Sequence, residues 1–262
     1  MFTLCGCLFA SVAAHDLFLK LDTFFLRPHS KATVSLMNGT FRESEGAVAR
    51  ERLRDVIVVS PSGQVARPPD GAWRDDGATT RLDLETGGEG TYVLAVSTVP
   101  REIDLKAKDF NEYLEHDGLP DVLAARRKAG ELDKGARERY SKHVKAVLQV
   151  GEARTETYAK PLGYPAEITP RQNPYSLRAG RTLEVLCTLA GKPVANQYVL
   201  SGFDDGARLS REVGARTDAR GVARVKLTGA GRWYVKMIHM SPSAEPGLDY
   251  ESKWATLTFE VR

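Results

Sequence analysis

The five histidines are the residues of this sequence whose chemistry most suggests a binding site. They are His15, His29, His116, His143 and His239. No two of them have the close spacing, H-x-H or H-x₃-H, with which one strand or helix presents two imidazoles to a metal ion. A metal site in this protein would therefore have to be assembled by the fold.

His15 is the most informative histidine because it follows a segment that resembles a secretion signal. Residues 2–14 (FTLCGCLFASVAA) carry no charge and end in small residues, which is typical of a signal-peptide core and cleavage site. Cleavage after Ala14 would let the α-amine and the imidazole Nδ1 of His15 chelate one ion. Such nitrogen ligands suit Cu(II), Ni(II) and Zn(II), with Cu(II) first in the general order of affinity.

The cysteines allow other interpretations of the N-terminus. Residues 4–7 (LCGC) resemble a lipoprotein motif, so a lipid anchor at Cys7 is one alternative, and retention of the segment is another. After cleavage only Cys187 would remain, and a secreted chain without disulfides favours a bacterial periplasm or exterior. In its segment, LEVLCTL, Cys187 is expected to be a buried apolar thiol.

His239 is the best partner for His15. It follows Trp233, Val235 and Met237 at every second position of an expected strand. This spacing places His239 on the core-facing side, at the end of the strand. We therefore expect His239 to supply a second imidazole; the alternative is a hydrogen-bonded histidine at the rim of the core.

Two further histidines are possible ligands, and one is excluded. His116 stands in the acidic segment EYLEHDGLP, which fits either a metal site or a solvated helix end. His29 follows Arg-Pro in an expected turn, where a surface residue is the alternative. His143 lies in the segment KHVK, whose lysines would repel a cation, so we exclude it.

Period-two alternation of apolar and polar residues dominates the elements that must position these histidines. Glycine- and proline-rich turns separate the alternating segments, which are 15–25, 55–60, 92–98, 182–189, 198–203, 222–227, 233–240 and 255–261. Many short strands of this kind predict a mainly β protein with two antiparallel immunoglobulin-like or prealbumin-like β-sandwich regions.

Residues from about 104 to 148 favour helix instead and predict a helical insert. Apolar residues spaced i, i+3 and i+4 from Phe110 indicate a first helix, and Pro120 stands at a first-turn position of a second. The stripe that begins at Tyr140 and continues at i+4 and i+7 indicates a third.

The predicted organisation has three parts. Residues 1–14 form the signal peptide, residues 15–151 an N-terminal β domain that contains the insert, and residues 152–262 a C-terminal β-sandwich domain. The boundary is placed near Gly151 because the following segment 158–174 carries four prolines, which is typical of a connector.

The composition excludes several classes of protein. Hydrophobic residues make up 42% and charged residues 27%, which is ordinary for a globular chain and excludes disorder and coiled coil. A net charge of +3 argues against a dedicated nucleic-acid binder. After residue 14 no apolar run approaches the ~20 residues of a membrane helix, so the mature chain is expected to have no transmembrane segment.

Several segments, in order along the chain, resemble one bacterial family. They include AHDLFLK, DFNEYLEHDGLPDV, PAEITPRQNPYSLRAG and GRWYVKMIHM. This family consists of secreted domains of unknown function and is described as similar to the substrate-binding component of nickel-uptake transporters. The resemblance implies periplasmic metal binding, with a membrane transporter as a possible partner.

The expected function is binding of nickel or copper, with zinc as a third candidate, by a periplasmic protein accessory to metal uptake or delivery. His15 and His239 would be the main ligands, and the protein would be a binder rather than an enzyme. Two alternatives stay open: an extracellular β module that binds a glycan or a protein partner, and a copper-brace redox enzyme. The mature N-terminus, the bound metal and any oxidant-dependent turnover discriminate among them, and the distance from His15 to His239 is the most useful structural observation.

Overall fold

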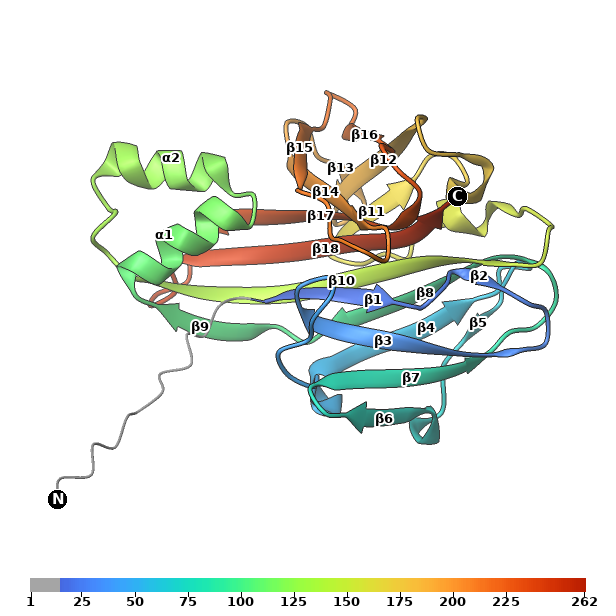
Figure 1. Ribbon diagram of the computed structural model, residues 1–262. Helices are drawn as coiled ribbons and strands as arrows, with labels where there is room; N and C mark the ends of the chain where they lie inside the picture. The colour runs from blue at the N-terminus through green and yellow to red at the C-terminus, as the bar shows by residue number, and fades with distance from the viewer. Residues whose placement is uncertain (1–14) are drawn as a thin grey trace, which may run out of the picture.

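The computed structural model describes residues 15–262. The expected signal peptide 1–14 and the alternative lipid attachment at Cys7 lie outside the described residues. The described chain is built mainly from strands, so the prediction of a mainly β protein is confirmed. Figure 1 shows long strands running through the molecule, with two helices at one end of them.

In this part of the chain the strands form three sheets. The N-terminal sheet has the order β1 (Asp16–Lys20), β3 (Lys31–Gly39), β7 (Thr79–Glu85) and β6 (Trp73–Asp76). The C-terminal sheet has the order β11 (Ala166–Pro170), β12 (Thr182–Leu189) and β13 (Lys192–Pro193), with β16 (Val222–Lys226) also paired to β12.

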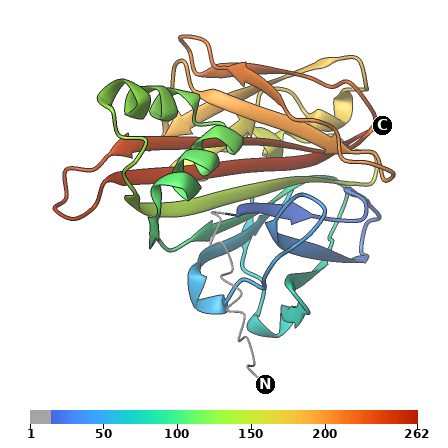
Figure 2. The same cartoon turned by 60° about the vertical axis from the view of Figure 1, so that its left-hand side comes forward.

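The ten-stranded central sheet lies between these two. Its order is β15 (Val213–Arg216), β14 (Tyr198–Asp204), β17 (Gly231–Pro242), β18 (Tyr250–Val261), β10 (Ala136–Val150), β8 (Gly90–Thr98), β4 (Leu53–Val59) and β5 (Val65–Ala66), with β2 (Phe25–Leu26) and β9 (Arg101–Leu105) also paired to β10. Figure 2 shows its long strands between the blue N-terminal strands and the yellow strands of the C-terminal sheet.

A parallel pair of strands joins the two halves of the chain in the central sheet. β10 pairs in parallel with β18, with Lys142 opposite Trp254, and β18 pairs antiparallel with β17, with Trp254 opposite Ile238. Strands from both sides of Gly151 therefore belong to one sheet.

Both faces of the central sheet are covered. One face, here called the helix face, carries the N-terminal sheet and the two helices. On this face Thr258 of β18 donates a hydrogen bond to the carbonyl of Leu19 in β1, and Ile238 of β17 packs in the cluster formed around Phe110, here called the helix cluster. The opposite face, here called the C-sheet face, carries the C-terminal sheet, where Lys145 of β10 donates to Thr169 of β11. Because side chains alternate along a strand, even-numbered residues of β17 lie on the helix face and odd-numbered ones on the C-sheet face.

Two of the three predicted helices are present, α1 (Ala107–His116) and α2 (Pro120–Ala129). Phe110, Tyr113 and Leu114 form the buried side of α1, as their spacing predicts. The Tyr113 ring stacks on Trp254 of β18, with 5.7 Å between the ring centroids. α2 ends at Gly130, whose φ of 68° is the left-handed conformation that glycine adopts readily.

The third predicted helix is wrong, because residues 136–150 form the strand β10. Every residue from Ser141 to Val150 is buried, since β10 is covered on both faces. A strand of this kind loses the polar and apolar alternation of a half-exposed strand. The stripe that begins at Tyr140 has helical spacing only because apolar residues occur on both faces of β10.

Candidate functional site

Two buried lysines of the central sheet fix the beginning of β1. Lys142 of β10 donates a hydrogen bond to the carbonyl oxygen of His15. Lys236 of β17 donates to Asp16 Oδ2 at 2.6 Å. His15 is therefore held at both its carbonyl and its following residue, although it stands just before the strand.

The imidazole of His15 faces a carboxylate. Its Nε2 lies 3.4 Å from Glu45 Oε2, with the His15 side chain 26% and the Glu45 side chain 51% exposed. Glu45 is placed by its backbone N–H, which donates to the carbonyl of Asn38, the partner of Leu17 in the β1–β3 register. A carboxylate at one ring nitrogen orients a histidine so that the other nitrogen is presented to an ion.

Three carboxylates converge on the ammonium group of Lys236. Asp16 of β1, Asp117 at the end of α1 and Glu212 before β15 lie 2.6, 3.5 and 3.2 Å from Nζ. Burial opposes the charge of Lys236, but attraction by the three carboxylates outweighs it and raises the pKa of Lys236 well above its ordinary value. One ammonium thus connects the start of β1, the end of α1 and the segment before β15.

The pKa values of two groups near Asp16 are shifted. Burial, together with the negative charge of Asp16, raises the pKa of Asp117 to about 7. Burial lowers the pKa of Lys142 to about 8, and its Nζ lies 4.7 Å from the centroid of the Trp254 ring. Asp16 Oδ1 is buried and has no hydrogen-bond partner among residues 15–262. The region is therefore rich in partly compensated negative charge.

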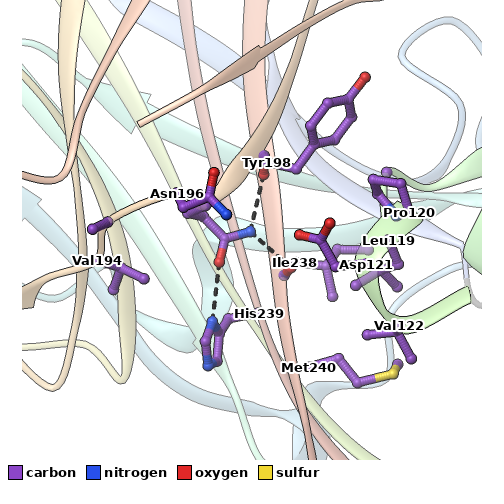
Figure 3. A pocket seen from close by; sticks show the side chains of 13 residues that line it. Leu119, Pro120, Asp121, Val122, Val194, Asn196, Tyr198, Ile238, His239 and Met240 are labelled. Atoms are coloured by element: carbon purple, nitrogen blue, oxygen red, sulfur yellow. Dashed lines mark hydrogen bonds between the residues drawn. The ribbon is translucent and has the colours of Figure 1, made fainter. Parts of the chain in front are cut away.

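His239 lies beside a different cavity, of about 220 Å³, between the start of α2 and the end of β17 (Figure 3). Its Nδ1 is 3.0 Å from Gln197 Oε1, and the Gln197 amide donates to the carbonyl of Ile238 at 3.0 Å. Burial lowers the pKa of His239, which favours the neutral ring. These contacts are those of a hydrogen-bonded histidine at the rim of the core.

The expected pairing of His15 with His239 is not present in this structure. His239 is an odd-numbered residue of β17 and lies on the C-sheet face, together with Val235 and Met237. The start of β1 lies on the helix face, where Asp16 contacts Lys236. The central sheet therefore separates the two histidines.

The other three histidines lie on other elements of the fold. His116, at the end of α1, and His29, in the turn before β3 with a φ of 50°, are exposed. His143 is buried between the hydroxyls of Ser97 and Ser141, and burial lowers its pKa to about 4. Within residues 15–262, no three His, Cys, Asp or Glu side chains form a group that would hold a metal ion.

Sequence reasoning missed the residues that surround the start of β1. Glu45 was not singled out, and neither was Lys236, although a lysine inside the apolar segment WYVKMI is itself a signal of a buried ion pair. Cys187 is buried as expected, and burial raises the pKa of its thiol to about 12.

Comparison with solved structures finds only distant similarity. The D0-D1 domain of intimin is 15% identical with a TM-score of 0.24, covering 93% of this chain and 97% of that one. The Escherichia coli adhesin FdeC is 12% identical with a TM-score of 0.23, covering 95% and 65%. The ligand-binding domain of human OSCAR is 13% identical with a TM-score of 0.21, covering 95% and 100%. At these TM-scores the similarities carry no argument about function.

Other comparisons concern the whole chain. No curated protein matches the sequence. Neither α1 nor α2, the helices of the described chain, has the length and apolar character needed to cross a membrane. The sequence profile of DUF4198, a domain of unknown function, matches residues 12–241. The chain therefore belongs to the DUF4198 family.

Proposed function

We propose that this protein binds a divalent transition-metal ion, copper or nickel, at the start of β1, as a periplasmic accessory to metal uptake or delivery. The observation that carries the proposal is the position of the His15 imidazole, whose Nε2 lies 3.4 Å from the Glu45 carboxylate. The metal ion is the cargo of the protein in this proposal, and no catalytic step is assigned to it.

The His15 side chain offers one ring nitrogen to an ion. The contact with Glu45 is made by Nε2 and therefore does not occupy Nδ1. Cleavage after Ala14 would place the α-amine beside Nδ1, and the two nitrogens would form a chelate. Nitrogen ligands favour Cu(II) over Ni(II) and Zn(II) by general affinity.

The surroundings support binding of a cation. The Glu45 carboxylate is 51% exposed and lies at the imidazole, so it presents negative charge to an approaching cation. The charges of Asp16, Asp117 and Glu212, by contrast, are compensated by Lys236, Lys142 and Arg52. Without His239, few protein ligands surround the ion, which suits a protein that passes its ion to a partner.

The test compares two forms of the chain that differ only at the α-amine of His15. A chain that begins at His15 has the free amine beside Nδ1, whereas the same chain acetylated at this amine keeps the imidazole and loses the chelate. We expect one Cu(II) per chain by isothermal titration calorimetry for the first form, and binding at least roughly tenfold weaker for the second. Titrations with Ni(II) and Zn(II) decide the identity of the cargo.

Substitutions separate the parts of the site. His15→Ala is expected to abolish stoichiometric binding, and Glu45→Gln to weaken it by roughly 10- to 100-fold, because a carboxylate that orients a histidine contributes about this much. His29→Ala and His116→Ala are matched controls and are expected to bind as the wild type does. Wild-type affinity in His15→Ala, or equal affinity of the two chain forms, would overturn the proposal.

A further inference from the structure

A second cavity lies between the N-terminal sheet and the central sheet, at the side where β5 forms the sheet edge. Its volume is about 360 Å³. Its walls are mainly aliphatic: Leu84 of β7 stands on one side, and Val58 of β4 with Leu148 and Val150 of β10 on the other. This size and lining are typical of sites for small apolar ligands.

The cavity is an unfilled part of the sandwich core. Leu82, two residues before Leu84 on the same side of β7, is fully buried, whereas Leu84 is only half-buried. Val58 is likewise half-buried, while Leu94, its partner in the β4–β8 register, is fully buried. Apolar side chains thus line a hollow where the two sheets would otherwise close on each other.

The charged groups of the cavity lie at its mouth. Asp83 is already bound by Thr33 and by Arg74, and Glu85 stands opposite Lys31 across the β3–β7 register. Arg67 is 70% exposed and contacts Asp55 through Nη2 alone, at 3.0 Å. The other N–H groups of the Arg67 guanidinium can therefore donate hydrogen bonds to an anionic group at the mouth of the cavity.

We propose that this cavity binds a medium-chain fatty acid, with the alkyl chain between the sheets and the carboxylate at Arg67. A dry apolar cavity of about 150 Å³ accommodates benzene, so the present volume has room for roughly ten to fourteen carbon atoms. Burial of the half-buried Leu84 and Val58 against the alkyl chain provides the affinity, because it removes apolar surface from water. The guanidinium group of Arg67 provides the preference for an acid.

The experiment is a calorimetric titration of the whole chain with decanoic acid and, separately, with decanol. It gives the affinity and the stoichiometry of each ligand. We expect one decanoic acid per chain. Leu84→Trp fills the cavity and is expected to weaken the binding of decanoic acid at least tenfold. Val213→Trp, at an exposed valine on the other edge of the central sheet, is the matched control and is expected to leave this binding unchanged.

Arg67→Gln tests the head group. Arg67→Gln is expected to weaken the binding of decanoic acid several-fold and to leave the binding of decanol unchanged. An equal effect on both ligands, or on neither, overturns the assignment of the carboxylate to Arg67. Failure of decanoic acid to bind, or wild-type binding by a folded Leu84→Trp, overturns the cavity site itself. A wild-type dimer that Leu84→Trp converts to a monomer identifies a second copy of the chain as the occupant and also overturns it. Copper titration is a separate measurement and does not depend on these outcomes.

Discussion

Replacement of Lys236 by methionine tests whether the buried ion cluster holds three parts of the protein together. The change removes the one ammonium that Asp16, Asp117 and Glu212 share and keeps a side chain of similar length. Because the side chains of Lys236 and Asp16 are only 6% and 11% exposed, water replaces the ammonium poorly at Asp16. Removal of one partner from a buried ion pair costs about 3–5 kcal/mol, and we expect a loss of this size at pH 8.

The loss of stability caused by Lys236→Met is expected to be smaller at lower pH. The pKa of Asp117 is raised to about 7, mainly by burial. A carboxylate with a pKa raised above its unfolded value of about 3.9 contributes stability below that value and loses it as the pH rises through the folded pKa. Without the positive charge of Lys236, the pKa of Asp117 is expected to rise further, so the variant takes up a proton, and therefore gains stability, between pH 8 and pH 5.

Urea denaturation followed by circular dichroism at pH 8 and pH 5 measures both effects. Lys253→Met is the matched control, because Lys253 is 27% exposed and lies 3.9 Å from Glu251, and such a pair contributes less than about 1 kcal/mol. The reasoning is refuted if Lys236→Met loses less than about 1 kcal/mol at pH 8, or if its loss is the same at both pH values.

Three further substitutions test other parts of the fold. Phe110→Ala empties the centre of the helix cluster, where Phe110 is fully buried, and should cost about 3–5 kcal/mol in urea denaturation, with faster tryptic cleavage of α2. Burial alone would raise the pKa of Asp204, but Arg42, a backbone N–H and Lys20 hold this pKa well below its usual range. The ionised Asp204 therefore stabilises the wild type above about pH 4, and this stabilisation is lost as the pH falls. Asp204→Asn should be less stable above about pH 4, and its free energy of unfolding should fall less steeply below it. Gly221→Ala should lower the melting temperature by several degrees, roughly 2–4 °C per kcal/mol, because φ is +75° and a Cβ would lie 2.8 Å from Pro193 Cβ.

The spacing of apolar residues correctly predicted the type of an element only where that element is buried on one side and exposed on the other. Phe110, Tyr113 and Leu114 line one side of α1, so their helical spacing was a reliable signal. β10 has buried residues on both faces, and the same kind of spacing from Tyr140 was misleading there. A pattern of apolar residues reports burial, and it reports the type of element only where one side remains exposed.

The surroundings of His15 and His239 were less predictable because they depend on which sheet or helix covers each face of the central sheet. Alternation correctly placed His239 on a core-facing side of its strand, but β17 has core on both sides. Nothing in the sequence distinguishes the face that meets β1 from the face that meets β11. Glu45 and Lys236 come close to the start of β1 only through pairing of distant strands, and no local pattern records such pairing.

The position of β18 has a consequence for how the molecule is made. This strand lies in the interior of the central sheet, between β17 and β10, and it follows every other described strand along the chain. During synthesis β10 therefore emerges long before its parallel neighbour. Until the twelve residues of β18 emerge, β10 presents an open hydrogen-bonding edge, and a chaperone or a slow release step would protect it from pairing with other chains.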